Sequence, residues 1–271
     1  MYSFQQTLSK IIRDVIFRSS LLVFLFVSCE PNVQNLDLPD QGKYVILECY
    51  LTPGYPPELT LTQSNTLDED LVINNLWYAD VSLDIDGVIH PMKNMLYSKP
   101  DRRIMVNYRA DDTLQIAGND HFALSVFTRQ QETLTATTNT VSPIRITDCR
   151  ITDSRIDVRY DVEGDDANWL KMGVVLFTDK KISPFIQYFD VKEQAKGVAT
   201  LLWKRPAAVV DSISVTLFNI QKDYYDYGVS VQNAVSAYHD PFLTPEAIKS
   251  NINGGIGIFT YYTSDKKTIR Y

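Results

Sequence analysis

Three histidines and three cysteines are the side chains of this sequence best suited to acid–base or nucleophilic chemistry. The histidines, His90, His121 and His239, lie far apart, and the sequence has neither a His-Glu-x-x-His zinc motif nor a Gly-x-Ser-x-Gly nucleophile elbow. A catalytic triad can still assemble from distant residues. A secreted hydrolase therefore remains the lesser alternative, and we expect a protein that is not an enzyme and has no catalytic residues.

Cys29 has a different chemistry, because it directly follows an apolar run at residues 21–27 and the small residue Ser28. This run is far shorter than the roughly 20 residues that a membrane-spanning helix needs. A basic segment before it completes the layout of a secretory signal peptide. A thiol at this boundary resembles the lipobox of bacterial lipoproteins, in which the cysteine receives a diacylglycerol. We predict a lipoprotein signal peptide over residues 1–28 and lipidation of Cys29; an ordinary signal peptide that ends near a cysteine is the alternative.

The segment after the cysteine, EPNVQNLDLPDQG (residues 30–42), is polar, contains two prolines and ends in glycine. It has no helix or strand periodicity. We predict that residues 29–42 form a lipidated tether. An edge strand over residues 33–38 is the alternative.

The chain is acidic, with a formal net charge of −7. Removal of residues 1–28 takes away Lys10, Arg13, Arg18 and Asp14, so the net charge becomes about −9. Such a surface binds nucleic acid poorly. No nucleic-acid partner is expected.

Apolar and polar residues alternate with a period of two over most of the chain, which is typical of β-strands. KYVILECYL (residues 43–51) and ADVSLDI (residues 79–85) are clear examples, and Asp-Gly at 86–87 is a strong hairpin signal. Turn signals at short intervals favour sandwiches of about 100 residues. We predict a mainly β protein with two β-sandwich (immunoglobulin-like) domains, an N-terminal one over 43–142 and a C-terminal one over 143–271.

One segment of the C-terminal domain breaks the strand pattern. Residues 221–238 lack proline and place Tyr224, Tyr227, Val231 and Val235 at helical spacing. We predict one α-helix near 221–238 that packs on the second sandwich, with this stripe in the core.

Two thiols remain besides Cys29. Cys49 lies on the inward face of its predicted strand, so a buried free thiol is the default. A disulfide between Cys49 and Cys149 in an oxidising compartment is the open alternative.

Two further groups of residues are candidate binding sites. Trp77 and Tyr78 lie in NNLWYAD, where they form either an exposed contact surface for a protein or a sugar, or the first inward residues of the next strand. The acidic stretches at 68–70 and 163–168 lack the spaced loop of a calcium site and are expected to be solvated turns. No metal and no cofactor is expected.

The closing part of the chain contains an Asp-Pro-Phe segment and then an Asn-Ile-x-Gly-Gly-x-Gly-Ile-Phe strand. The matching residues are Asp240, Pro241, Phe242, Asn251, Ile252, Gly254, Gly255, Gly257, Ile258 and Phe259. With the early segment YVILECYLTPGYPPELTLTQS, this pattern resembles a large family of uncharacterised Bacteroidota lipoproteins, a domain of unknown function. Strand-like residues follow the glycines, which argues against a phosphate-binding loop. Positive φ or close backbone approach is the expected role of these glycines.

The resemblance implies an outer-membrane lipoprotein with a β-rich, two-domain body, of a kind commonly encoded beside TonB-dependent outer-membrane transporters. The expected function is that of a lipid-anchored accessory protein that partners such a transporter in nutrient uptake. The lipid on Cys29 would hold it to the outer membrane, on the periplasmic or the surface face. A free-standing surface adhesin or glycan-binding module is the alternative.

Overall fold

The computed structural model describes residues 42–66, 69–70, 72–99, 104–115, 120–164, 167–178, 182–193, 197–205, 210–240, 242–244 and 246–270. Most of their secondary structure is β, and a single α-helix packs against the strands among these residues, which confirms the predicted fold class. The predicted signal peptide and Cys29 lie outside the described residues.

The first half of the described chain forms strands that all join one sheet. They are β1 (Val45–Leu51), β2 (Glu58–Gln63), β3 (Asn74–Asn75), β4 (Asp80–Ile85), β5 (Val88–Lys99), β6 (Ile104–Ala110), β7 (His121–Phe127) and β8 (Thr133–Asn139). With β15 (Ile256–Tyr261) they make, in the described residues, a nine-stranded sheet of order β15-β1-β2-β6-β5-β4-β7-β8, in which β3 pairs with β2.

The two ends of this sheet order come together. The backbones of Thr135 in β8 and Asn253, just before β15, exchange two hydrogen bonds, of 3.1 and 2.9 Å. The sheet therefore curls around a core, to which the inward residues of its strands contribute. The alternation predicted for 43–51 is confirmed, since Val45, Leu47, Cys49 and Leu51 are all buried.

The hairpin turn predicted at 86–87 is also confirmed. It joins β4 to β5, and both Asp86 and Gly87 have positive φ, of 49° and 87°. This is the conformation of a type I′ turn, whose twist matches that of the flanking strands.

The second half of the chain forms a two-sheet sandwich. Its strands are β9 (Ile144–Ile151), β10 (Arg155–Val162), β11 (Trp169–Phe177), β12 (Ile182–Asp190), β13 (Val198–Leu202), β14 (Ser212–Ile220) and β16 (Thr263–Arg270), with the 3-10 turn η1 (Val191–Glu193). The sheet β13-β10-β9 faces the sheet β12-β11-β14-β16 across a second core, which includes Ile156, Val158, Met172 and Val215.

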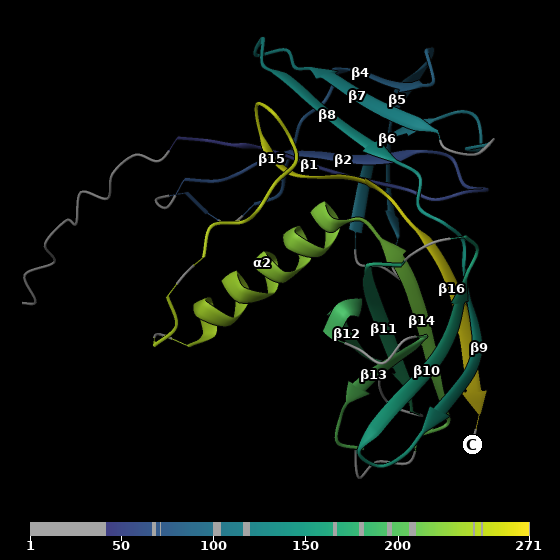
Figure 1. Cartoon of the computed structure of the whole chain (residues 1–271). Coiled ribbons are helices and arrows are strands. Elements are labelled where there is room, and N and C mark those ends of the chain that lie inside the picture. Colours follow the sequence, from purple (N-terminus) through teal and green to yellow (C-terminus); the bar gives the residue numbers. More distant parts are fainter. Residues whose placement is uncertain are drawn as a thin grey trace, which may run out of the picture. The chain divides into compact units, whose positions relative to one another are not determined.

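The chain returns to the first sheet near its end, as Figure 1 shows. Strand β15 runs parallel to β1, whereas β16 pairs antiparallel with β14 in the second sandwich. The sequence order places residues 256–261 in the C-terminal domain. In the structure they complete the N-terminal sheet, and Tyr262 lies at the crossing, where its N–H donates to Leu51 O at 3.0 Å.

The α-helix expected near 221–238 is observed as α2 (Lys222–His239). Its first turns contact both halves of the chain. The Tyr227 hydroxyl donates a hydrogen bond to Glu48 Oε1 in β1 at 2.5 Å. Tyr224 Oη accepts a hydrogen bond from Lys171 Nζ in β11 at 2.6 Å. A Cβ at Gly228 would lie 2.2 Å from Tyr188 Cζ in β12, so the helix backbone packs directly on that ring.

The predicted core stripe on α2 is wrong in its last member. Tyr224 is buried and Tyr227 half-buried, but Val235 is 54% exposed. The buried positions of α2 are Tyr224, as predicted, and the small residues Gly228 and Ser230, because the sheets contact the first half of the helix and approach it closely there.

We call Glu48, Tyr50, Lys171, Tyr188, Tyr224 and Tyr227 the junction cluster, since these residues link α2 to both halves of the chain. Burial, followed by the nearby Glu48 carboxylate, raises the pKa of Tyr50 and of Tyr227 well above the ordinary value. Burial raises the pKa of Tyr188 to about 12, against the opposing charge of Lys171. The phenols of Tyr50, Tyr188 and Tyr227 thus stay protonated in the folded protein at neutral and moderately alkaline pH.

This cluster predicts a loss of stability at high pH. The unfolded chain releases these phenolic protons near the ordinary pKa of 10.0, before the folded protein does. The free energy of unfolding is therefore expected to be unaffected by them below about pH 10 and to fall above it, by up to about 1.4 kcal/mol per pH unit for each phenol. Urea unfolding at about pH 9 and about pH 11, with tyrosinate absorbance as a second signal, measures this. Full ionisation of all 16 tyrosines near the ordinary pKa in a still folded protein would contradict it.

Candidate functional site

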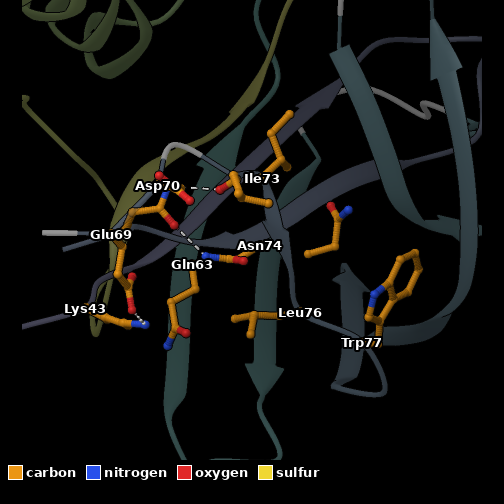
Figure 2. Close-up of a pocket in the computed structure, with 11 residues that line it drawn as sticks. Lys43, Gln63, Glu69, Asp70, Ile73, Asn74, Leu76 and Trp77 are labelled. Atoms are coloured by element: carbon orange, nitrogen blue, oxygen red, sulfur yellow. Dashed lines mark hydrogen bonds and ion pairs between the residues drawn. The ribbon is translucent and has the colours of Figure 1, made fainter. Parts of the chain in front are cut away.

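A pocket of about 600 Å³ opens beside the short strand β3. Residues of the end of β2, of the described segment that follows it, and Lys43, which lies two residues before β1, form its walls (Figure 2). The polar lining residues are Gln63, Asn65, Asn74 and Asn75, the charged ones are Lys43, Glu69 and Asp70, and the apolar ones are Val72, Ile73, Leu76 and Trp77. Its volume falls within the usual range for small-molecule sites.

Hydrogen bonds between lining residues hold the loop in place. Asn74 Nδ2 donates to Asn65 Oδ1 at 2.6 Å, and Asn65 Nδ2 donates to Val72 O at 2.9 Å. Lys43 Nζ lies 2.6 Å from Glu69 Oε1. Figure 2 shows Lys43 and Glu69 at one end of the pocket and Trp77 at the other.

Asn107 in β6 positions the inner wall of the pocket. It is fully buried, and its Nδ2 donates to Leu61 O at 2.8 Å and to Leu76 O at 3.2 Å. Its Oδ1 accepts from Leu61 N at 2.8 Å. Asn107 therefore fixes the backbone at Leu76, the residue that directly precedes Trp77. Sequence reasoning missed this residue; the only signal was an amide within the otherwise apolar IMVNY stretch.

Asn75 carries an unsatisfied polar atom at the pocket. Its Oδ1 is buried, and it has no hydrogen-bond partner among the described residues. Such an oxygen costs about 1–3 kcal/mol of desolvation. A donor that enters the pocket offers the Asn75 amide a partner if the side chain turns toward it.

The structure places Trp77 and Tyr78 in the loop before β4, with both side chains on the surface. Trp77 is 36% exposed and lines the pocket, whereas Tyr78 is 66% exposed and is not among the lining residues. Tyr78 has a positive φ of 60°, and its N–H donates to Asn94 Oδ1 at 3.1 Å. The Arg129 guanidinium lies 4.3 Å from the centre of its ring. The two aromatics thus have separate surroundings.

We call residues 251–259 the closing segment. Its glycines lie where the two ends of the first sheet meet. Gly257 is paired with Leu47 in β1 and has a φ of 137°, and a Cβ there would lie 1.9 Å from Leu47 O. Gly254 has a φ of 83°, and its Cβ would lie 2.3 Å from Thr133 O. A Cβ at Gly255 would lie 2.8 Å from Val45 O. These positions admit only glycine between β1 and β8.

Side chains of the closing segment complete this arrangement. Asn251 makes two hydrogen bonds with the backbone of Phe259, from its Nδ2 to Phe259 O at 2.8 Å and from Phe259 N to its Oδ1 at 3.0 Å. Phe259 and Ile252 are buried in the first core. The closing segment therefore stabilises the sheet that carries the pocket.

A comparison with protein families matches residues 32–268 to the domain of unknown function DUF4249. The chain belongs to the DUF4249 family. The match spans both halves of the structure, including the pocket, α2 and the closing segment. It confirms the expectation of a family of unknown function. A comparison with curated proteins gives no match.

The end of α2 gives the DUF4249 chain an exposed apolar group. Asp240 ends the helix, and its Oδ1 accepts from Phe242 N at 3.0 Å, which turns the chain. Phe242 is 94% exposed and Tyr238 85% exposed, and Val235 and Leu243 are also exposed. Pro241 lies outside the described residues. We call Val235, Tyr238, Phe242 and Leu243 the helix-end patch.

The three histidines of the chain occupy separate places. His90 is in β5 and His121 begins β7, where its Nδ1 lies 2.8 Å from Asn139 Oδ1. His239 ends α2 with its ring against Tyr238. Within the described part of the chain, none of these rings is hydrogen-bonded to a serine, a cysteine or a carboxylate, and no group of three or more His, Cys, Asp and Glu side chains is placed to hold a metal ion.

Cys49 and Cys149 are both free thiols, so the open alternative of a disulfide between them is not observed. Cys49 is buried in the first core and Cys149 is half-buried against the second. Burial raises the pKa of Cys49 well above its ordinary value and that of Cys149 to about 11. In the described ranges, no helix has both the length and the apolar character to span a membrane.

These environments predict a clear order of thiol reactivity. Because the thiolate is the reactive form, Cys149 is expected to react slowly with Ellman's reagent in the native protein, and Cys49 only after unfolding. Stopped reactions followed by peptide mass spectrometry assign each thiol, and Cys149→Ser serves as the control. Equal rates for the two thiols in the native protein would contradict the burial of Cys49.

Proposed function

We propose that this protein is a lipid-anchored accessory protein of the outer membrane of Bacteroidota, which partners a TonB-dependent transporter and helps it capture a nutrient. The lipobox-like sequence at Cys29 and the resemblance of residues 239–265 to lipoproteins encoded beside such transporters support this proposal. The observation that carries it in the structure is the helix-end patch. Its four exposed apolar side chains lie within nine residues of the chain, and clusters of exposed apolar side chains are typical of protein–protein contact sites.

The position of the pocket fits the same role. Lys43, at one end of the pocket, is 14 residues after Cys29. A chain of that length spans at most about 50 Å. A ligand held in the pocket would thus stay near the membrane in which the transporter lies.

Site-specific cross-linking tests the proposed contact. A photo-reactive phenylalanine analogue replaces Phe242 in the full chain, expressed in its own cells, and adducts are identified by mass spectrometry after irradiation. The matched control carries the analogue at Leu202, which is 80% exposed in β13 of the second sandwich.

The proposal expects an adduct with a TonB-dependent transporter from position 242 and a much weaker one from position 202. Equal adducts from both positions would remove the helix-end patch as the contact. Absence of any transporter adduct, with the lipoprotein still in the outer membrane, would favour the free-standing adhesin or glycan-binding module over the accessory role.

A further inference from the structure

The geometry points to the pocket beside Trp77 as a binding site for a neutral oligosaccharide. This inference names the chemical class of the nutrient in the proposed function. It rests on that function only for the role of the bound sugar as a nutrient. The binding itself is a property of the pocket residues. It can therefore be tested without a transporter.

The hydrogen-bonding groups of the pocket match hydroxyl groups. A sugar hydroxyl both donates and accepts, and Gln63, Asn65, Asn74 and Asn75 present amides that do the same. Asn65 and Asn74 already bond to each other at 2.6 Å, which orients their remaining donors and acceptors. Asn75 Oδ1 is buried and lacks a partner among the described residues, and a hydroxyl donor supplies one when the side chain turns toward the pocket. A pocket lined by several oriented amides suits a ligand with many hydroxyls.

Trp77 supplies the apolar surface that a sugar ring also needs. A pyranose ring has a face of C–H groups, which packs on an aromatic ring, and hydroxyls around its rim. The Trp77 indole is partly exposed at one end of the pocket, and Val72 and Ile73 add exposed apolar side chains to the lining. Aromatic side chains contribute large contact areas with little loss of conformational entropy. The combination of one indole and several amides distinguishes this pocket from a purely apolar one.

The charges of the pocket disfavour an anionic ligand. Lys43 lies 2.6 Å from Glu69, so its charge is already matched by a carboxylate. Asp70 adds a second carboxylate to the lining, and the whole chain has a net charge of −7. A phosphorylated or uronic sugar would meet repulsion here. Carboxylates accept hydrogen bonds from hydroxyls, so they support a neutral saccharide.

The test uses the full-length lipoprotein in a detergent that has no sugar headgroup. Binding of maltotriose, cellotriose and mannotriose is measured by calorimetry, with trigalacturonate and trialanine as anionic and peptide probes. Labelling with 5-fluorotryptophan gives a fluorine resonance for each of the three tryptophans. The resonance of Trp77, assigned by its loss in Trp77→Phe, reports whether the ligand is in the pocket.

At least one neutral trisaccharide is expected to bind with a dissociation constant of about 1 mM or tighter and to shift the Trp77 resonance. Trp77→Ala and Gln63→Leu are each expected to weaken this binding at least about tenfold, which is about 1.4 kcal/mol. Tyr78→Ala is the matched control, since Tyr78 is the adjacent exposed aromatic outside the pocket lining, and it should leave the affinity unchanged.

Three results would overturn the saccharide site: no binding of any neutral trisaccharide at about 1 mM, preferred binding of trigalacturonate or trialanine, or equal losses in Tyr78→Ala and Trp77→Ala. Gln63→Leu changes a half-buried side chain at the end of β2 and leaves the core residues of that strand in place, so this variant carries the test even if Trp77→Ala is unstable. Failure here would leave a transporter adduct from position 242 intact, so the two proposals fail separately.

Discussion

Alanine at position 257 is expected to destabilise the protein by about 3–5 kcal/mol, among the largest effects of a single substitution. The reason is geometric. A Cβ at Gly257 would lie 1.9 Å from Leu47 O, and Leu47 belongs to the central strand β1, which cannot move without breaking its pairing with β2. The φ of 137° adds backbone strain for any residue other than glycine.

Thermal unfolding of Gly257→Ala, followed by circular dichroism, measures this effect, and the melting temperature should fall by roughly 10 °C. Gly54→Ala is the matched control. Gly54 also has a positive φ, of 77°, but nothing lies within 4 Å of its added Cβ. It should lose only about 1 kcal/mol. Similar losses of stability in both variants would contradict the claim that Gly257 is needed for the close approach of β15 to β1.

Cys29→Ala is expected to abolish lipid attachment and to remove the protein from the outer membrane. Two or three acyl chains anchor a protein stably in a membrane, whereas the polypeptide without acyl chains lacks this anchor. Metabolic labelling with an alkyne fatty acid, followed by membrane fractionation, measures both effects. The wild-type chain should carry the label in the outer-membrane fraction.

Cys149→Ser serves as the thiol control for this experiment, because Cys149 is a half-buried free thiol of the second sandwich. It should keep full labelling. Label that persists in Cys29→Ala, or an unlabelled wild-type chain that still fractionates with the outer membrane, would contradict anchoring through Cys29.

The local features of the fold were predictable because they depend on neighbouring residues. The alternation in 43–51 follows from the period of a strand, and the turn at 86–87 follows from the Asp-Gly pair. The helix near 221–238 follows from the spacing of its tyrosines. In each case the information lies within about ten residues of the feature, and the sequence contains it.

The non-local features were not predictable in the same way. The parallel pairing of β15 with β1 joins Leu47 to Gly257, more than two hundred residues apart, and no local pattern indicates that partner. The exposure of Val235 depends on where the sheets end against α2. The helical spacing of the tyrosines does not indicate how far along the helix the sheets extend.

The candidate site was predicted only in part, for a related reason. Trp77 stood out as an aromatic in a polar segment, but its neighbours in the pocket come from β2, β3, the described segment between them, and Lys43, two residues before β1. Asn107, which holds the inner wall, lies in β6 and acts through hydrogen bonds to the backbones of Leu61 and Leu76. Such a site depends on strand order, which follows from the whole sheet.

Affinity capture of the native lipoprotein from outer membranes solubilised in mild detergent tests the accessory role most directly. Quantitative mass spectrometry of the captured material gives the amount of each partner relative to the lipoprotein. The proposed function predicts a TonB-dependent transporter in near-equal amount. Recovery of the lipoprotein alone, with no partner in comparable amount, would contradict that role.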